Sequence, residues 1–247
     1  MRYLLLFALT CSLLRADTLA DLKAKLATMN GDNRVTATVE YEFKNLGTDD
    51  NQTVKAQGKA SAAAEDGPDG IRITWARDLI AGIDQEARES AKDPAKQNNL
   101  RRAAGGINPM MVHDNLSAAS GVLRQLEEAE FVGEQADTWE GRPARLLTLK
   151  LPLPKNPQAR KYIKEWNATV KVWVGADNLP LAGEMRVQQK GRAFLVIGFE
   201  GESKEDFRFA AVGQRLVIVR RFRESSNSNP GQKTHDTSLI TIKLDPG

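Results

Sequence analysis

The fold of this chain is decided by residues 129–187, where two stretches, AEFVGEQADTWEGRPARLLTLKLP (129–152) and VKVWVGADNLPLAGEMRV (170–187), alternate apolar with polar side chains. Each stretch contains a turn, at Trp139-Glu140-Gly141 in the first and at Ala176-Asp177-Asn178 in the second. A period of two is typical of strands with one buried face. The two stretches therefore predict antiparallel neighbours in a sheet.

The same period predicts strands elsewhere in the chain. It is strictest from Arg34 to Lys44, and a second strand is expected from Thr53 to Ala63. One face of this second strand leaves room above it because it carries only small residues, Ala56, Gly58, Ala60 and Ala62. Further strands are expected at 71–75, 130–135, 144–151, 168–174, 181–189, 192–200, 207–212, 216–223 and 238–244, with 225–231 as a wide hairpin connection.

Two regions have helical spacing instead. The first runs from Thr18 to Met29 and begins with a pattern typical of a capping box. The second, at about residues 78–128, has few β-branched residues and is interrupted at Asp93-Pro94, and its last helix is expected over 114–128. We interpret this second region as a helical insertion that lies over the sheet, not as a separate domain.

The N-terminus has the pattern of a secretory signal peptide, in which Arg2 precedes the apolar run LLLFALTCSLL at residues 4–14. This run is too short to span a bilayer, which needs about 20 residues, and no other run approaches that length. We expect cleavage after Ala16, which leaves residues 17–247 as one domain. Alternatively Cys11 is the acylated residue of a lipoprotein, although the residues before it fit a lipobox poorly.

The charge balance does not indicate a nucleic-acid partner. The formal net charge is +3, and loss of Arg2 and Arg15 with the leader lowers it by two, to +1. Proteins that bind nucleic acids usually carry a cationic surface. The local cluster Arg220, Arg221 and Arg223 is interpreted as a solvated edge.

No pattern of residues establishes catalysis. His113 and His235 each precede an aspartate, but sequence neighbours do not face each other on a helix or strand. They are interpreted as surface or capping residues, and no zinc site is expected. No G-x-S-x-G motif surrounds a serine, and paired acids such as Glu205-Asp206 are interpreted as solvated. The chain is expected not to be an enzyme and to need no metal or cofactor.

The remaining signal is a set of apolar residues at inward-facing positions of the predicted strands. One interpretation is a core that is packed against the helices. The other is that a curved sheet cannot fill its own concavity and leaves an apolar ligand pocket. The ligand-binding residues expected on the strands are Val39, Tyr41, Phe43, Ile73, Trp75, Val172, Val174 and Met185.

The order of elements resembles the bacterial periplasmic lipoprotein-carrier superfamily, which includes the outer-membrane lipoprotein-sorting proteins and related lipid-binding half-barrels. Three segments carry the resemblance. They are the helix at 18–29 leading into VTATVEY (35–41), then WEGRPARLLTL (139–149), and VWVGADNLPL (172–181). The resemblance implies an α+β fold, mainly antiparallel β, in which helices cover the concave face of a strongly curved sheet or incomplete β-barrel.

The resemblance also implies a periplasmic or secreted carrier or sensor that binds a lipid or an acylated protein without a covalent bond. In this interpretation the helical cover opens at a flexible connection, residues 105–111, with Gly105 and Gly106 as its hinge. Met110 and Met111 would contact the ligand. The carrier's functional arginine cannot be matched to Arg34 or to another position, so the cargo stays open.

The alternative is a structural or interaction domain of the cell envelope, with a filled core and an exposed edge that pairs with a partner strand. A hydrolase would need a buried acid or histidine at the pocket mouth. The sequence does not identify the cargo, the partner protein or the oligomeric state.

Overall fold

The computed structural model describes residues 10–49, 52–93, 95–193 and 197–245. Residues 1–9 of the expected leader lie outside these ranges. The first helix, α1 (Thr10–Ala27), begins inside the apolar run of the expected leader and includes most of the helix predicted at 18–29.

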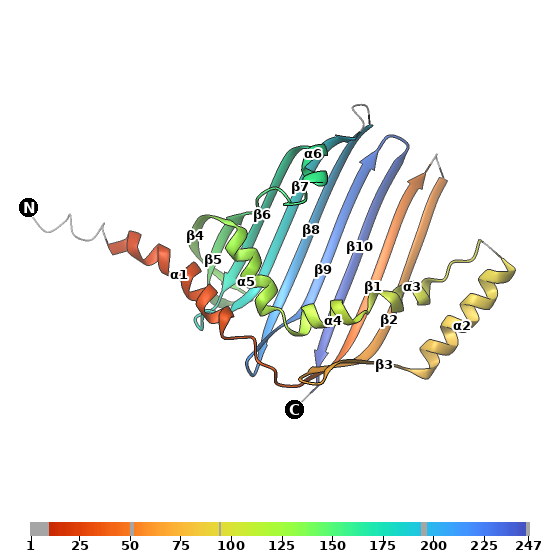
Figure 1. Cartoon of the computed structure of the whole chain (residues 1–247), viewed down its shortest axis with the longest axis horizontal. Coiled ribbons are helices and arrows are strands. Elements are labelled where there is room, and N and C mark those ends of the chain that lie inside the picture. Colours follow the sequence, from red (N-terminus) through yellow and green to blue (C-terminus); the bar gives the residue numbers. More distant parts are fainter. Residues whose placement is uncertain (1–9, 50–51, 94, 194–196, 246–247) are drawn as a thin grey trace, which may run out of the picture.

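Ten strands form one antiparallel sheet (Figure 1). Their order is β3-β2-β1-β10-β9-β8-β7-β6-β5-β4, so that β3 and β4 are the two edges and the sheet does not close into a barrel. The strands are β1 (Val35–Asp49), β2 (Gln52–Gly67), β3 (Gly70–Trp75), β4 (Glu130–Trp139), β5 (Arg142–Lys150), β6 (Ile163–Val174), β7 (Pro180–Ala193), β8 (Ile197–Val212), β9 (Arg215–Asn229) and β10 (Gln232–Leu244). The predicted fold class, an α+β fold built mainly on an open, curved antiparallel sheet, is confirmed.

The connection between the edge strands explains why helices cover one face of the sheet. β3 and β4 follow each other in the sequence but lie at opposite edges, so the chain between them must cross the sheet. Four helices make this crossing: α2 (Arg77–Lys92), α3 (Asn99–Gly106), α4 (Pro109–Leu116) and α5 (Ala119–Glu128). In Figure 1, α2 lies beside the β3 edge while α3, α4 and α5 cross the strands. The helix expected over 114–128 is divided at Ser117, and the short α6 (Pro157–Tyr162) precedes β6.

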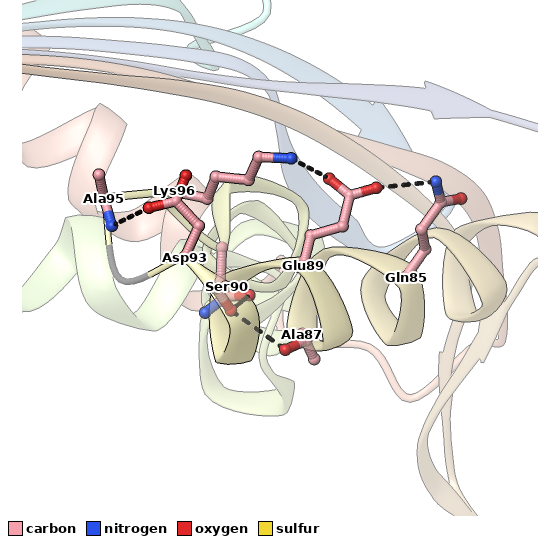
Figure 2. A network of polar contacts seen from close by, with 8 residues as sticks. Gln85, Ala87, Glu89, Ser90, Asp93, Ala95 and Lys96 are labelled. Carbon is pink, nitrogen blue, oxygen red and sulfur yellow. Dashed lines mark hydrogen bonds and ion pairs between the residues drawn. The ribbon is translucent and has the colours of Figure 1, made fainter.

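The end of α2 is fixed by polar contacts and not by burial. No residue of α2 is fully buried. Figure 2 shows that Gln85 and Lys96 donate to the two carboxylate oxygens of Glu89, at 3.0 and 3.1 Å, and that the Ala95 N–H donates to the Asp93 carboxylate at 3.0 Å. The Gln85 amide and then Lys96 hold the pKa of Glu89 below its usual value. These contacts attach the turn before α3 to the end of α2.

The turn predicted at Trp139-Glu140-Gly141 is confirmed. Glu140 and Gly141 have φ values of +50° and +78° and form a two-residue connection between β4 and β5. Positive φ at both central residues is the geometry that matches the twist of a hairpin, and glycine adopts it without steric cost. The second predicted turn also contains a left-handed residue, Asn178, at φ +61°.

Two predictions near hairpin ends are wrong, one of a strand and one of a loop. β7 ends at Ala193 and β8 begins at Ile197, so the strand expected at 192–200 spans a hairpin, and the one expected at 207–212 is the far end of β8. β9 and β10 continue through the expected loop at 225–231, where only Pro230 and Gly231 separate them.

Two hydrophobic cores lie between the helices and the sheet. The first, here called the α3 core, places Ala103, Val112 and Leu116 of the helices on β1, β2 and β10. Its β2 face consists of the small residues that the sequence predicted to leave room, and a Cβ at Gly58 would lie 2.6 Å from the Asn99 carbonyl oxygen. The second, the α1 core, packs α1 and α5 on β5, β6 and β9, with Leu22 and Leu147 fully buried.

A buried polar cluster joins several elements at one end of the α3 core. Asp66 at the end of β2 accepts hydrogen bonds from Arg215 Nη1, at 2.9 Å, and His113 Nδ1 lies 3.1 Å from the same carboxylate oxygen. Arg215 Nε also donates to the Gly31 carbonyl at 2.9 Å. The Asp66 cluster therefore links β2, β9, α4 and the loop before β1.

Candidate functional site

Residues that face the helices form rows across the sheet. Directly opposed residues of an antiparallel pair point to the same face, so the strand register defines each row. One row, from β5 to β1, consists of Leu149, Val170, Met185, Glu205, Arg223, Ser238 and Phe43. The next row consists of Leu147, Val172, Gly183, Phe207, Arg221, Ile240 and Tyr41. Because Gly183 has no side chain, this second row has a gap between Val172 and Phe207.

A cavity of about 420 Å³ lies over this gap, between α5 and strands β6 to β9. We call it the α5 cavity. Its sheet side is mainly apolar and includes Val170, Val172, Gly183, Met185, Phe207, Phe209 and Ile218. Its helix side is formed by the end of α4, by Ser117 and Ala118, and by residues 120–126 of α5. Its volume falls within the range of about 300–1,000 Å³ that is typical of small-molecule sites.

One wall of the α5 cavity carries a buried charged cluster. The Glu205 side chain is only 6% exposed, and one of its oxygens accepts hydrogen bonds from Arg221 Nε at 2.9 Å and Nη2 at 2.7 Å. Arg223 Nε lies 3.6 Å from the other oxygen. The Arg221 guanidinium also lies 5.4 Å from the centre of the Phe207 ring. Paired in this way, the carboxylate can stay buried beside an apolar cavity.

A second hollow, of about 340 Å³, lies on the same face beside α3. We call it the α3 hollow. Arg102 of α3 lies 4.7 Å above the Phe43 ring, and Arg223, Ser225 and Ser238 line the strand side. Burial raises the pKa of the Tyr41 phenol at this hollow, although Arg102 and Arg223 oppose the shift.

The structure divides the expected ligand-binding residues between the two halves of the covered face. Val172 and Met185 line the α5 cavity, and Val174 lies in the α1 core beside it. Val39 and Phe43 are buried in the α3 core, where Tyr41, Ile73, Trp75 and Met111 pack against them. The α3 core is therefore filled by side chains, as in the packed-core interpretation, although Tyr41 and Phe43 also line the α3 hollow, and the α5 half contains the cavity.

The structure places the expected ligand contact at Met110 and the expected hinge as follows. Met110 was expected to contact a ligand, but it is 75% exposed at the start of α4 and faces away from the cores. The segment 105–111 was expected to be a flexible connection, but Gly105 and Gly106 belong to α3 and Asn108 caps α4 by accepting from the Met111 N–H at 3.0 Å. Gly106 is needed for packing, because a Cβ there would lie 2.4 Å from the Tyr41 ring.

Exchange of each glycine for alanine separates packing from helix propensity. Gly106→Ala is expected to lower the free energy of unfolding by about 1–3 kcal/mol, because the new methyl group overlaps the Tyr41 ring. Gly105→Ala meets no atom within 4 Å and is expected to raise the free energy of unfolding by about 0.5–1 kcal/mol. Urea denaturation measures both. Equal effects of the two substitutions would contradict the packing role of Gly106.

Sequence reasoning missed the charged side of the site. Glu205-Asp206 and Arg221 were interpreted as solvated, but Glu205 is buried and Arg221 is its partner. The available signal was the alternation of β8, since Phe209 and Phe207 face inward and a step of two reaches Glu205. An inward-facing acid that follows inward-facing aromatic residues along the same strand indicates a buried partner.

The two histidines contact acids other than those that follow them in the sequence. His113 contacts Asp66, and His235 lies 3.0 Å from Ser226 Oγ and 3.4 Å from a Glu224 oxygen. Within the described part of the chain, no three His, Cys, Asp or Glu side chains gather as ligands of a metal ion. In the same part, no helix combines the length and the apolar character needed to span a membrane.

Comparisons with known proteins give weak overall likenesses. No family model matches the chain, and no curated protein matches it. A structure of a DUF1329 family protein from Desulfovibrio piger is similar over 94% of this chain and 93% of its own, with 10% identity and a TM-score of 0.29. A putative outer membrane lipoprotein-sorting protein domain from Vibrio parahaemolyticus is similar over 93% of this chain and 92% of its own, with 12% identity and a TM-score of 0.31.

Proposed function

We propose that this protein binds the acyl chain of a lipid or acylated protein in the α5 cavity, as an exported carrier or sensor in the periplasm or outside the cell. The observation that carries the proposal is the cavity itself, a space of about 420 Å³ between helix α5 and a mainly apolar wall of the sheet. Its cause is local. Gly183 leaves a gap in a row that is otherwise filled by Val172 and Phe207.

The energetics favour a flexible apolar ligand. Each CH₂ group that leaves water for an apolar site gains about 0.8 kcal/mol, so partial burial of one chain is already a substantial contribution. The charged pair on the sheet wall, Glu205 and Arg221, is joined by two hydrogen bonds. An acyl chain against this wall would therefore leave the Glu205 carboxylate paired.

Ligand entry is compatible with an intact sheet. The cavity cover consists of α5 and the end of α4, whereas its floor belongs to strands that are paired on both sides. Movement of the cover would leave the strand hydrogen bonds intact, as expected of a lid over a rigid scaffold. Gly105 and Gly106 lie at the end of helix α3, before α4. We keep them as the proposed hinge on which this cover would move.

One observation favours the second candidate, an interaction domain of the cell envelope. Phe131 and Val132 on the edge strand β4 are 38% and 51% exposed. An uncovered edge with apolar side chains can accept a partner strand. We rank this candidate second because pairing at the edge gives no role to the cavity.

Native mass spectrometry tests the proposed function. The protein is purified without detergent from a homologous bacterial envelope, weighed intact, and extracted with organic solvent. We expect a bound lipid or acylated peptide that disappears from the spectrum after extraction. A clean apo mass, together with no uptake of a fluorescent fatty acid, would contradict acyl binding and favour the interaction domain.

A further inference from the structure

Two arginines on different elements leave their terminal nitrogens available at the α3 hollow. Arg102 reaches it from α3, with its guanidinium over the Phe43 ring. Arg223 reaches it from β9 and contacts Glu205 only through Nε, at 3.6 Å. Among the described residues, no acceptor forms a hydrogen bond with the guanidinium of either arginine. Both therefore present free donors to the same hollow.

The charges around these arginines leave an excess of positive charge. The lining of the α3 hollow contains two arginines, Arg102 and Arg223, and one carboxylate, Asp236, so its formal charges sum to +1. Glu205 is occupied by Arg221, and Asp236 accepts a hydrogen bond from the Asn45 amide. Because Glu205 is neutralised mainly by Arg221 and reaches Arg223 only at Nε, the excess positive charge lies with Arg102 and the terminal nitrogens of Arg223.

The α3 hollow lies next to the end of the α5 cavity. Glu205 and Arg221 line the cavity, Arg223 lines the hollow, and Glu205 is the direct cross-strand neighbour of Arg223. The charged cluster is therefore the boundary between the two spaces. The apolar cavity is on one side of it, and the hydroxyl-bearing hollow is on the other.

The sheet face becomes polar beyond this boundary. In the row after Arg223, away from the gap at Gly183, the opposed residues are Val187, Ser203, Ser225, Asp236 and Asn45. One step further they are Gln189, Gly201, Asn227, Thr234 and Gly47. This gradient gives an amphiphile one orientation, with its tail under α5 and its polar end towards Arg223.

We propose that Arg102 and Arg223 bind the anionic headgroup, a carboxylate or a phosphate, of the amphiphile whose tail occupies the α5 cavity. The proposal rests on the proposed function and names its ligand class. A guanidinium matches these oxyanions because its planar donors form paired, charge-assisted hydrogen bonds. The Ser225 and Ser238 hydroxyls lie at the same hollow and can donate to the remaining oxygens.

Calorimetry with three ligands of equal tail length tests the headgroup site. Dodecanoate and dodecyl phosphate carry the charge, and dodecanol lacks it. We expect the native protein to bind at least one charged ligand about tenfold more tightly than dodecanol, as hydrogen bonds to a charged group would give. The charged ligand that binds more tightly identifies carboxylate or phosphate as the preferred headgroup.

Arginine variants locate that preference. Arg102→Gln combined with Arg223→Gln should remove the preference and leave dodecanol binding unchanged, because the tail site is not altered. Arg220→Gln is the matched control, since Arg220 pairs with Arg208 and Thr241 on the other face of β9 and should keep the preference.

The outcomes separate this inference from the proposed function. Equal binding of all three ligands by the native protein would overturn the headgroup site but leave the acyl site standing. A preference that survives in the double variant would also overturn it. No binding of any of the three would overturn the acyl site, and the headgroup site with it.

Discussion

Arg215→Ala is expected to lower the free energy of unfolding by about 3–5 kcal/mol, the usual cost of leaving one member of a buried ion pair without its partner. The side chains of Arg215 and Asp66 are 5% and 4% exposed, and their closest nitrogen and oxygen are 2.9 Å apart. The substitution also removes the hydrogen bond to the Gly31 carbonyl. Urea denaturation, followed by circular dichroism, measures the change.

Arg34→Ala is the matched control for this loss. Arg34 and Asp69 are also 2.9 Å apart, but their side chains are 54% and 79% exposed. An exposed pair contributes roughly 0–1 kcal/mol because water screens it. The two variants thus compare the same interaction in two environments. A loss below 1 kcal/mol in both would show that the Asp66 cluster carries no buried-charge penalty.

The position of the Asp66 cluster connects stability to the cover. His113 belongs to α4, and its ring contacts the carboxylate that Arg215 also binds. Loss of Arg215 should therefore increase amide hydrogen exchange in α4 and α5 before it affects the central strands, whose amides are paired on both sides.

The sequence predicted the sheet because side-chain alternation is a local property. It could not predict that β1 pairs with β10, since nothing local relates residues that are about 200 positions apart in the register Ala37 to Leu244. The sequence also did not predict the end of strand β9 at 225–229, where a loop was expected. There β9 and β10 extend beyond helices α3 to α5 (Figure 1), so both faces are polar and the residues resemble a loop.

The α5 cavity was harder to predict than the apolar rows that surround it. Inward-facing positions such as Val172 and Met185 follow from the period of two, but whether they are packed depends on which helix lies over them. The α3 core is filled because the alanine face of β2 lets α3 approach closely. The α5 half has Gly183 in the same kind of position, but α5 does not fill the gap. This difference is a tertiary property of the crossing helices.

Gly183→Leu is expected to weaken binding of a fluorescent fatty acid by roughly a hundredfold. The four carbons of the new side chain would occupy the space of about four methylene groups of the ligand, and at 0.8 kcal/mol each they account for about 3 kcal/mol. A Cβ at this position has only ordinary contacts, with Lys171, Phe207 and Phe209 each at 3.6 Å. The strand should therefore accept the change, and equilibrium fluorescence titration measures the affinity.

Gly133→Leu is the matched control, because Gly133 lies in β4 and a Cβ there meets no atom within 4 Å. It introduces the same side chain into the same sheet away from the α5 cavity, so the affinity for the fatty acid should stay within about twofold of the native value. A folded Gly183→Leu variant with native affinity would place the ligand elsewhere. If it loses affinity while thermal unfolding is unchanged, filling of the cavity is the cause, since misfolding and general loss of stability are then excluded. The comparison thus tests whether the missing side chain of Gly183 provides space that the ligand occupies.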